Sequence, residues 1–382
     1  MLPSFAVTTP RRKQPISATT TFAPIILLVL LAFLLVFATL WFKVQPDGHD
    51  LSYLKNPNLR DPSSPPAWIN ATRVKAAFVI LTRNSELDGV RTAMRQLEAR
   101  FNHKFNYPYI FLNDEPFTDD FKHLTASLTN AETKYGLIPE EHWGYPSWID
   151  VGKANASRKA MEEAGIIYGG SLSYRHMCRF ESGFFYRHPL LEDYEYYWRV
   201  EPNVEFFCDL DYDPFLYMKE NNLKYGWTIS LLEYEQTIPT LWSTVQSFVN
   251  EYPELIPEQN MLDFVSNDNG YSYNLCHFWS NFEIGDLKFL RSEAYTKFFD
   301  YLDRAGGFFY ERWGDAPVHS IAVSLFLDKS QVHFFEDIGY KHDDFMHCPQ
   351  PRELQKKCHC DSHASFDYTA NSCYRRWIRL KN

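Results

Sequence analysis

The stretch KAAFVILTRNSELDGVRTAMRQLEARFNHKFNYPYIFL, residues 75–112 of the 382-residue chain, decides the fold. It opens with a continuous apolar run at 75–81, which is typical of a buried strand. After a polar loop at 82–84, apolar residues return at helical spacing: Val90, Met94, Leu97 and Phe101. A second apolar run follows at 109–112. A strand, a helix and a strand in this order predict a βαβ unit and therefore a parallel sheet.

The rest of the chain continues this pattern. Further strands are predicted at 195–200, 225–231 and 332–335. Further helices are predicted at 241–250, 287–302 and 317–327, and Asp315 and Pro317 mark the start of the last one. We therefore expect residues 71–382 to form one α/β domain that buries a substantial core.

The first 70 residues differ from this domain in composition. Residues 25–42 (IILLVLLAFLLVFATLWF) carry no charge, and a helix of that length would measure about 27 Å, close to the ~30 Å bilayer core. A cleaved signal peptide usually has a shorter apolar run, so we interpret 25–42 as a transmembrane signal anchor. Residues 1–24, with Arg11, Arg12 and Lys13, would hold the cytosolic tail and the start of the membrane segment. Residues 43–70 read as a stem, and 71–382 would be lumenal.

The cysteine content agrees with a lumenal domain. An oxidising compartment favours up to three disulfides, with one thiol left over from seven cysteines. A zinc site is the alternative for one cluster near the C-terminus: His347, Cys348, Cys358, His359, Cys360 and His363. Disulfides are the better interpretation because the cluster has no tight CxxC pair. The formal net charge of −10, without a basic block, argues against binding to nucleic acid.

The most informative polar residues follow the strand predicted at 195–200. There the sequence reads Glu201-Pro202-Asn203, with Arg199 two residues earlier. Ligands of open α/β sheets collect at the carboxyl ends of strands, so Glu201 is a candidate ligand for a divalent metal held against a diphosphate. Taken alone, such a carboxylate is more often a turn or salt-bridge residue.

Two arginines lie four residues apart in a segment that reads as helical. Arg175 and Arg179 would share one helix face, where guanidinium groups suit phosphate oxygens. Pairing with acidic side chains near the core is an equally good interpretation.

Two further titratable residues lie in apolar surroundings. Glu283 follows several aromatic residues, and desolvation of that kind raises a carboxyl pKa and marks a candidate for catalysis. A satisfied buried glutamate is the alternative. His319 stands in the first turn of an apolar helix, where a core role is usual, but it could complete a metal site with Glu201.

Five blocks of the sequence together carry a family resemblance. They are VILTRNSELDGV, YGGSLSYRHMCRFESGFFY, YYWRVEPNVEFFCDLDYDPF, YNLCHFWSNFEIGDLKFLRS and RWGDAPVHSIAVSLFL. In this order they resemble the main blocks of the fungal α-1,2-mannosyltransferases of glycosyltransferase family 15. The resemblance implies a GT-A-type fold, which is a Rossmann-like mixed sheet flanked by helices. It also implies a retaining transfer of mannose from GDP-mannose to an α-mannoside, a need for Mn²⁺ or another divalent cation, and a single-pass type II protein of the Golgi membrane.

The resemblance implies roles for eight residues of this chain. Glu201 and His319 match the metal ligands, and Glu283 matches the carboxylate proposed to act at the anomeric carbon. Trp279 is a candidate platform for the acceptor. The residues that match the donor site are Arg83, Tyr168, Tyr174 and Arg199.

One position departs from the family pattern. Many members carry Glu-Pro-Asp where this chain has Asn203 after Glu201 and Pro202. An amide can still form hydrogen bonds, so we expect activity to survive if the aspartate acts indirectly. The alternatives are a non-catalytic or weakly active carbohydrate-binding relative and a mannosylphosphate transferase. The class of acceptor, an N-glycan, an O-glycan or a lipid-linked mannose, stays open.

Overall fold

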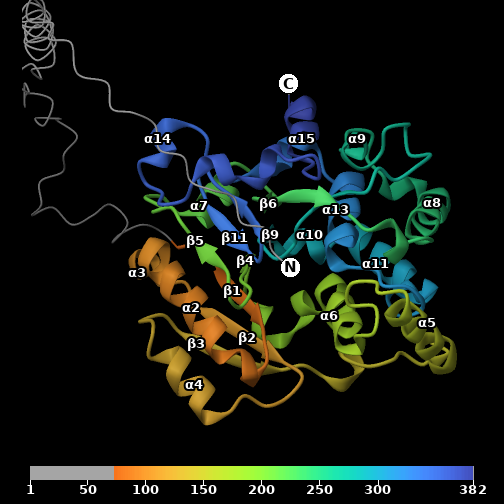
Figure 1. Ribbon diagram of the computed structural model, residues 1–382, viewed down its shortest axis with the longest axis horizontal. Helices are drawn as coiled ribbons and strands as arrows, with labels where there is room; N and C mark the ends of the chain where they lie inside the picture. The colour runs from red at the N-terminus through yellow and green to blue at the C-terminus, as the bar shows by residue number, and fades with distance from the viewer. Residues whose placement is uncertain (1–72, 382) are drawn as a thin grey trace, which may run out of the picture. The chain divides into compact units, whose positions relative to one another are not determined.

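The computed structural model describes residues 73–381, which form a mixed α/β fold around a seven-stranded sheet (Figure 1). The strand order is β10-β6-β9-β4-β1-β2-β3. The strands are β1 (Ala76–Leu81), β2 (Tyr109–Asn113), β3 (Thr133–Leu137), β4 (Tyr196–Arg199), β6 (Tyr225–Trp227), β9 (Glu283–Asp286) and β10 (Val332–Phe334). Strand β9 runs antiparallel to β4 and β6, and the other neighbours in the sheet are parallel.

Two smaller antiparallel sheets accompany the large one. The first is formed by β5 (Glu205–Phe206), β11 (Tyr340–His342) and β12 (Phe345–His347). The second is formed by β7 (Ser230–Leu232) and β8 (Cys276–Phe278). Both bring loops to the carboxyl end of the large sheet, as described below.

Helices cover both faces of the large sheet. Side chains of β1 alternate between the two faces, because successive residues of a strand point to opposite sides. Phe78 packs on the face covered by α2 (Leu87–Leu97), α4 (Asp119–Ala126) and α7 (Pro214–Glu220). Ala77 packs on the face covered by α6 (Leu172–Gly183), α8 (Leu241–Glu251), α11 (Glu293–Ala305) and α13 (Asp315–Phe326). The shorter or peripheral helices are α3 (His103–Phe105), α5 (Val151–Glu163), α9 (Leu262–Val265), α10 (Leu287–Leu290), α12 (Gly307–Tyr310), α14 (Arg352–Gln355) and α15 (Tyr374–Lys381).

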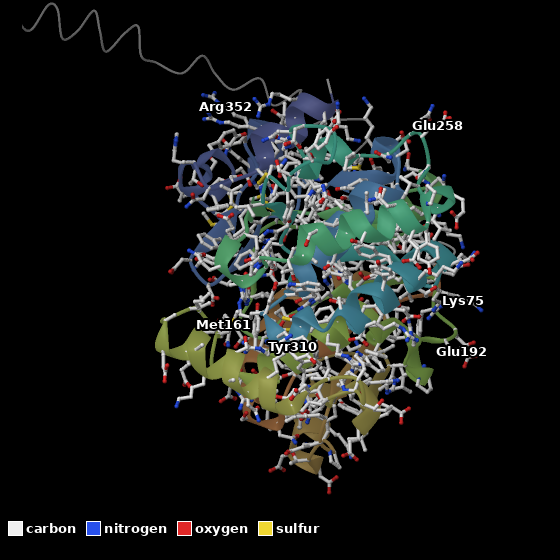
Figure 2. All side chains as sticks on the ribbon, turned by 90° about the vertical axis from the view of Figure 1, so that its right-hand side faces the viewer. Lys75, Met161, Glu192, Glu258, Tyr310 and Arg352 are labelled. Atoms are coloured by element: carbon white, nitrogen blue, oxygen red, sulfur yellow. A yellow bond between two sulfur atoms is a disulfide. The ribbon has the colours of Figure 1, made fainter. Side chains whose placement is uncertain are left out.

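Helix α5 is held at the edge of the domain by Tyr310 of α12 (Figure 2). The Tyr310 hydroxyl accepts a hydrogen bond from the backbone N–H of Asp150 (2.8 Å), the residue that caps α5. This contact fixes the N-terminal end of α5.

The predicted βαβ unit is confirmed, since β1, α2 and β2 follow one another and β1 pairs with β2 in parallel. Two predicted elements are wrong in extent. The strand predicted at 225–231 is two strands, β6 and β7, and the helix predicted at 287–302 is two helices, α10 and α11. Helix α11 starts anew because the side chain of Ser292 accepts the backbone N–H of Tyr295, which is an N-cap.

The disulfide interpretation is confirmed, and the zinc alternative is wrong. The bonded pairs are Cys208–Cys358, Cys276–Cys373 and Cys348–Cys360, which leaves Cys178 as a buried free thiol. Cysteines in disulfides cannot serve as thiolate ligands of zinc.

The predicted anchor at 25–42 lies outside the described residues, as do the tail at 1–24 and the stem at 43–70. Among residues 73–381, none of the helices has both the length and the apolar character needed to span a bilayer.

Candidate active site

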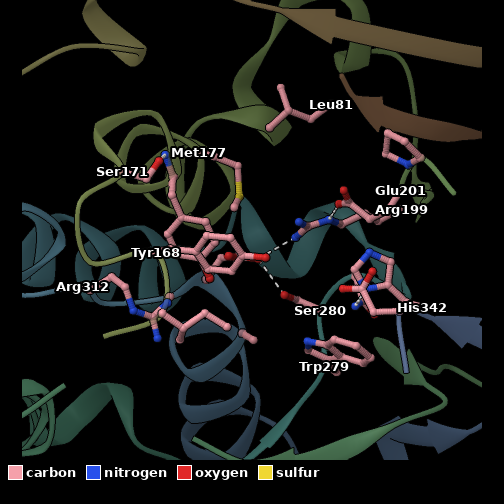
Figure 3. A pocket seen from close by; sticks show the side chains of 18 of the residues that line it. Leu81, Tyr168, Ser171, Met177, Arg199, Glu201, Trp279, Ser280, Arg312 and His342 are labelled. Carbon is pink, nitrogen blue, oxygen red and sulfur yellow. Dashed lines mark hydrogen bonds and ion pairs between the residues drawn. The ribbon is translucent and has the colours of Figure 1, made fainter. Parts of the chain in front are cut away.

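A cavity of about 630 Å³ opens at the carboxyl ends of β1, β2 and β4 (Figure 3). Open α/β sheets bind their ligands at this edge. Segments that are distant in sequence form the wall: Thr82 and Arg83 after β1, Asn113 and Asp114 at the end of β2, Glu201 and Pro202 after β4, Trp279 to Asn281 before β9, residues 314–317 at the start of α13, and residues 342–345 of the β11–β12 hairpin. The fold therefore gathers most of the chain's candidate site residues in one concave place.

Arg199, the last residue of β4, is nearly buried and fixes two carboxylates of this wall. Its Nε donates to Oε1 of Glu201 (2.6 Å) and its Nη1 donates to Oδ2 of Asp315 (2.6 Å). Burial alone would lower the pKa of Arg199, but the surrounding carboxylates raise it well above its ordinary value. We call Arg199, Glu201 and Asp315 the pocket cluster.

The pocket cluster has an excess of negative charge. A third carboxylate, Glu181, lies 3.9 Å from Nη1 of Arg199, but burial raises the pKa of Glu181 to about 8. The single guanidinium of Arg199 therefore contacts the carboxylates of both Glu201 and Asp315. Such a site favours a cation.

Asp315 occupies the first turn of α13. Burial acts to raise the pKa of Asp315, but Arg199 lowers it below its usual value, assisted by the hydroxyl of Ser280, which donates to Oδ2 (2.6 Å). The positive end of a helix dipole also favours an anion there. Asp315 is therefore a fixed negative charge in the pocket wall.

Glu201, which follows β4, and His342, the last residue of β11, both face the cavity (Figure 3). Arg199 engages Oε1 of Glu201, and Oε2 has no hydrogen-bond partner among residues 73–381. Nδ1 of His342 lies 2.9 Å from the side-chain amide of Asn281, and Nε2 has no partner within the described part of the chain. Because Nδ2 of Asn281 donates to Nδ1, Nε2 carries the proton of the neutral ring in this arrangement, and Nε2 can ligate a cation only once the Asn281 amide turns its oxygen toward Nδ1.

The donor set suits a hard divalent cation that also binds substrate. Among residues 73–381, no three His, Cys, Asp or Glu side chains converge to hold a metal by themselves. Mg²⁺ and similar ions are usually held by one or two carboxylates together with substrate phosphates, so two protein ligands are enough. Glu201 and His342 fit that role.

The structure does not bring His319 to Glu201, which corrects the predicted metal pair. Nδ1 of His319 lies 3.0 Å from Oε2 of Glu283, and Nε2 lies 3.2 Å from the backbone oxygen of Glu181. Both ring nitrogens are therefore engaged, and His319 does not line the cavity. Burial would lower the pKa of His319, but the Glu283 carboxylate raises it above its usual value. The usual core role of such a histidine is what the structure shows.

Glu283 is also absent from the cavity wall, and its side chain is fully buried. Its carboxylate accepts hydrogen bonds from the hydroxyls of Tyr197 (2.8 Å) and Tyr225 (2.9 Å) besides the contact with His319. We call these four residues the buried cluster. The predicted role of Glu283 at the anomeric carbon would need an approach that this arrangement does not provide.

Tyrosine and tryptophan rings also line the cavity. Tyr168, which is 53% exposed, stacks on Tyr174 with ring centroids 4.5 Å apart, and Arg312 lies 5.2 Å from the centre of the Tyr174 ring. Trp279 lies edge-on to His342 at 5.1 Å. Exposed ring faces of this kind suit the C–H surface of a sugar.

The arginines of the sequence separate into two groups. Arg83 is exposed at the mouth of the cavity, and its guanidinium forms no ion pair with any residue of the described part. Arg179 instead makes a bidentate pair with Asp303 (2.8 and 2.9 Å), and Arg175 donates to the backbone oxygens of Ser171 and Glu311. The phosphate-binding interpretation of Arg175 and Arg179 is therefore wrong.

Six of the eight predicted site residues line the cavity: Arg83, Tyr168, Tyr174, Arg199, Glu201 and Trp279. The sequence reading missed His342 and treated Asp315 only as a helix start. A signal was present for the first, because His342 stands in a short polar run, Lys341 to Asp344, between Tyr340 and Phe345. For Asp315 the signal was the pairing of a carboxylate with a helix N-terminus that is otherwise apolar.

The fold and the pocket define a class of protein, namely α/β proteins that bind a ligand at the strand ends of a parallel-rich sheet. The model of the glycolipid 2-alpha-mannosyltransferase family matches residues 48–382. The chain therefore belongs to this family of mannosyltransferases.

Individual relatives agree with that assignment. Alpha-1,2 mannosyltransferase KTR1 of Saccharomyces cerevisiae is 58% identical over 310 residues, which cover 81% of this chain and 79% of the relative. O-glycoside alpha-1,2-mannosyltransferase omh1 of Schizosaccharomyces pombe is 50% identical over 363 residues, covering 92% and 93% of the two chains. The solved Mn/GDP form of Core-mannan synthase A from Aspergillus fumigatus is 44% identical, with a TM-score of 0.77 over 81% of this chain and 86% of that chain.

Proposed function

We propose that this chain transfers mannose from GDP-mannose to an α-mannoside acceptor, in α-1,2 linkage and with retention of configuration, on a GT-A-type fold. The observation that carries the proposal is the pocket cluster, whose negative charge and free Glu201 oxygen face the same cavity as His342 and the exposed Arg83. The relatives support it, since two of them are named as α-1,2-mannosyltransferases and the solved one was obtained with Mn and GDP.

The polar residues divide the work of holding the donor. Glu201 and His342 would hold the divalent cation, which neutralises charge on the leaving diphosphate when it is bound. Arg83, at the mouth, would bind phosphate oxygens through its guanidinium. Arg199 holds Glu201 in place and does not itself need to touch the phosphates.

The geometry favours attack of the acceptor on the same face from which GDP leaves. Double displacement requires a carboxylate close to the anomeric carbon, as in retaining glycosidases. Glu283 does not line the cavity, and Asp315 is tied to Arg199 and Ser280. We therefore assign Glu283 a positioning role, through the strand β9 that supports the pocket wall.

Our proposal for the cellular setting is a type II protein of the Golgi membrane, anchored by residues 25–42. The apolar run supports the anchor, and the three disulfides support an oxidising lumen. The acceptor would then be an α-mannoside on an N- or O-linked glycan.

The direct test is mannose transfer by the full chain, with GDP-mannose, Mn²⁺ and methyl α-mannoside, followed by digestion of the product with an α-1,2-mannosidase. We expect a disaccharide that the mannosidase cleaves. A product that contains phosphate would favour the mannosylphosphate transferase, and binding of GDP without any transfer would favour the non-catalytic relative.

A further inference from the structure

Helix α5 contains a tripeptide that the mannose-transfer site does not use. It reads Asn155-Ala156-Ser157, which is the Asn-x-Ser/Thr pattern that accepts an N-linked glycan in the secretory lumen. Within residues 73–381 the pattern occurs once, and a second copy begins at Asn70, outside the described residues. The pattern is a usable site only where the folded chain leaves room for a bulky glycan.

Helix α5 presents Asn155 to solvent. Ala154 is the only buried residue of this helix, and it marks the face that packs on the domain. Asn155 lies on another face, whose members at helical spacing are all exposed: Gly152, Lys159 and Glu162. None of the residues of α5 lines the cavity. A glycan on Asn155 would therefore project into solvent without entering the cavity wall.

The two polar atoms of the Asn155 side chain differ in their contacts. Oδ1 accepts a hydrogen bond from the hydroxyl of Tyr145 (3.3 Å), whose ring centroid lies 4.8 Å from that of Phe309. Nδ2 has no hydrogen-bond partner within the described part of the chain. Attachment of a sugar replaces one hydrogen of Nδ2 and leaves Oδ1 an acceptor. The folded chain therefore loses no contact when the glycan is present.

The hydroxyl that the pattern requires has a partner in the folded domain. Oγ of Ser157 donates to the backbone oxygen of Tyr310 in α12 (2.5 Å). A modifying enzyme that reads this hydroxyl must therefore act before α5 packs on α12. The exposed Asn155 then only has to carry the finished glycan, which the open helix face permits.

We propose that Asn155 carries an N-linked glycan. In its formation, Nδ2 bonds to C1 of the first sugar of an oligosaccharide carried on a lipid diphosphate. The bond between C1 and the diphosphate breaks, the lipid diphosphate leaves with that electron pair, and Nδ2 gives up one proton. The assignment goes beyond mannose transfer and rests on the lumenal setting proposed above. Because α5 lies outside the cavity wall, the glycan leaves transfer unchanged.

The test is peptide mass spectrometry of the full chain, expressed with its N-terminal segment in a eukaryotic host. Peptide:N-glycosidase in heavy-oxygen water converts a glycosylated asparagine to labelled aspartate. Asn155→Gln removes the acceptor amide, whereas Ser157→Thr keeps both the pattern and a hydroxyl for Tyr310. The matched control is Asn130→Gln, because Asn130 is also exposed and followed by alanine, but Glu132 takes the third position.

We expect label at Asn155 in the unchanged chain and in Ser157→Thr. Asn155→Gln should run faster than the unchanged chain on a denaturing gel, by one glycan, with the same kcat/KM for transfer, and Asn130→Gln should match the unchanged chain in both. Sealed vesicles with added protease report the compartment separately. An unlabelled Asn155 in a chain that the vesicles protect overturns the assignment. If the protease digests the domain in sealed vesicles, the lumenal setting fails, and the assignment with it.

Discussion

Two groups of polar residues both draw on strand β4 and helix α13, and they differ in whether all their polar atoms are paired. In the buried cluster, on β9, β4, β6 and α13, each oxygen of Glu283 and each ring nitrogen of His319 has a protein partner. The pocket cluster leaves Oε2 of Glu201 without a partner in residues 73–381. Buried polar groups need hydrogen-bond partners within the protein, whereas a binding site leaves some polar atoms unpaired for its ligand. We therefore infer that the buried cluster stabilises the fold and that the pocket cluster takes part in binding the ligand.

The largest expected effect is on transfer by Glu201→Gln. The amide keeps the shape of the side chain but removes the charge that would face the cation, so kcat/KM for transfer from GDP-mannose should fall by about 100-fold or more. Glu205→Gln is the matched control, since Glu205 pairs with Lys341 outside the cavity wall and should leave kcat/KM unchanged. A Glu201→Gln rate within tenfold of the unchanged chain would contradict the role of the pocket cluster.

Substitution of His342, in the cavity, and of His319, in the buried cluster, should affect two different properties of the protein. His342→Ala should weaken Mn²⁺ binding in the presence of GDP by about 10- to 100-fold, with little change in the free energy of unfolding. His319→Ala should leave Mn²⁺ affinity unchanged but lower the free energy of unfolding by about 2–4 kcal/mol, because Glu283 is left buried without its partner. Mn²⁺ affinity is measured by calorimetric titration and the free energy of unfolding by urea unfolding, for both variants. Weaker Mn²⁺ binding in His319→Ala, with no weakening in His342→Ala, would contradict the assignment.

The buried cluster should also make stability depend on pH. The pKa of His319 is raised in the folded chain, so the native state keeps a proton that the unfolded chain releases near pH 6.5. The contribution is complete below that pH, and it is lost as pH rises through the folded pKa, by at most about 1.4 kcal/mol per pH unit. The difference in unfolding free energy between the unchanged chain and His319→Gln should shrink from pH 5.5 to 8.5. A difference that is flat or grows with pH would exclude this coupling.

The smallest expected effect concerns Asn203, where the family pattern has aspartate. Asn203 has φ of 61°, its side chain lies over Gly89 of α2, and it does not line the cavity. Asparagine and aspartate both tolerate this left-handed conformation, so Asn203→Asp should change transfer by less than about twofold. Asn203→Ala should cost about 1 kcal/mol of stability because alanine tolerates it less well. A large gain of activity in Asn203→Asp would show that the missing charge matters.

The sequence predicted the helices and strands better than it predicted which side chains line the cavity. Apolar runs and helical spacing gave β1, α2 and β2, because local periodicity reflects which face of an element is buried. The strand β9 was missed, since its four residues, Glu283–Asp286, begin and end with an acid and show no apolar run. Its burial comes from pairing with β4 and β6, which only the fold provides.

The errors among the predicted site residues also arise from contacts between residues that are distant in sequence. His319 and His342 are alike as residue types, and each stands near acids, so sequence alone does not separate them. Their difference lies in partners that are distant along the chain. His319 meets Glu283, 36 positions away, and His342 meets Asn281, 61 positions away. Residues such as Glu201 and Arg199 were found because they end a strand, where the topology forces them toward ligands.

One spectroscopic measurement tests the central claim, which is that the cation binds at Glu201 and His342 in the cavity and not at His319 in the buried cluster. Pulsed electron paramagnetic resonance of Mn²⁺ bound with GDP to the full chain detects directly coordinated nitrogen. We predict a nitrogen modulation from one imidazole that is lost in His342→Ala and retained in His319→Ala. A signal that survives in His342→Ala and disappears in a folded His319→Ala would contradict the account.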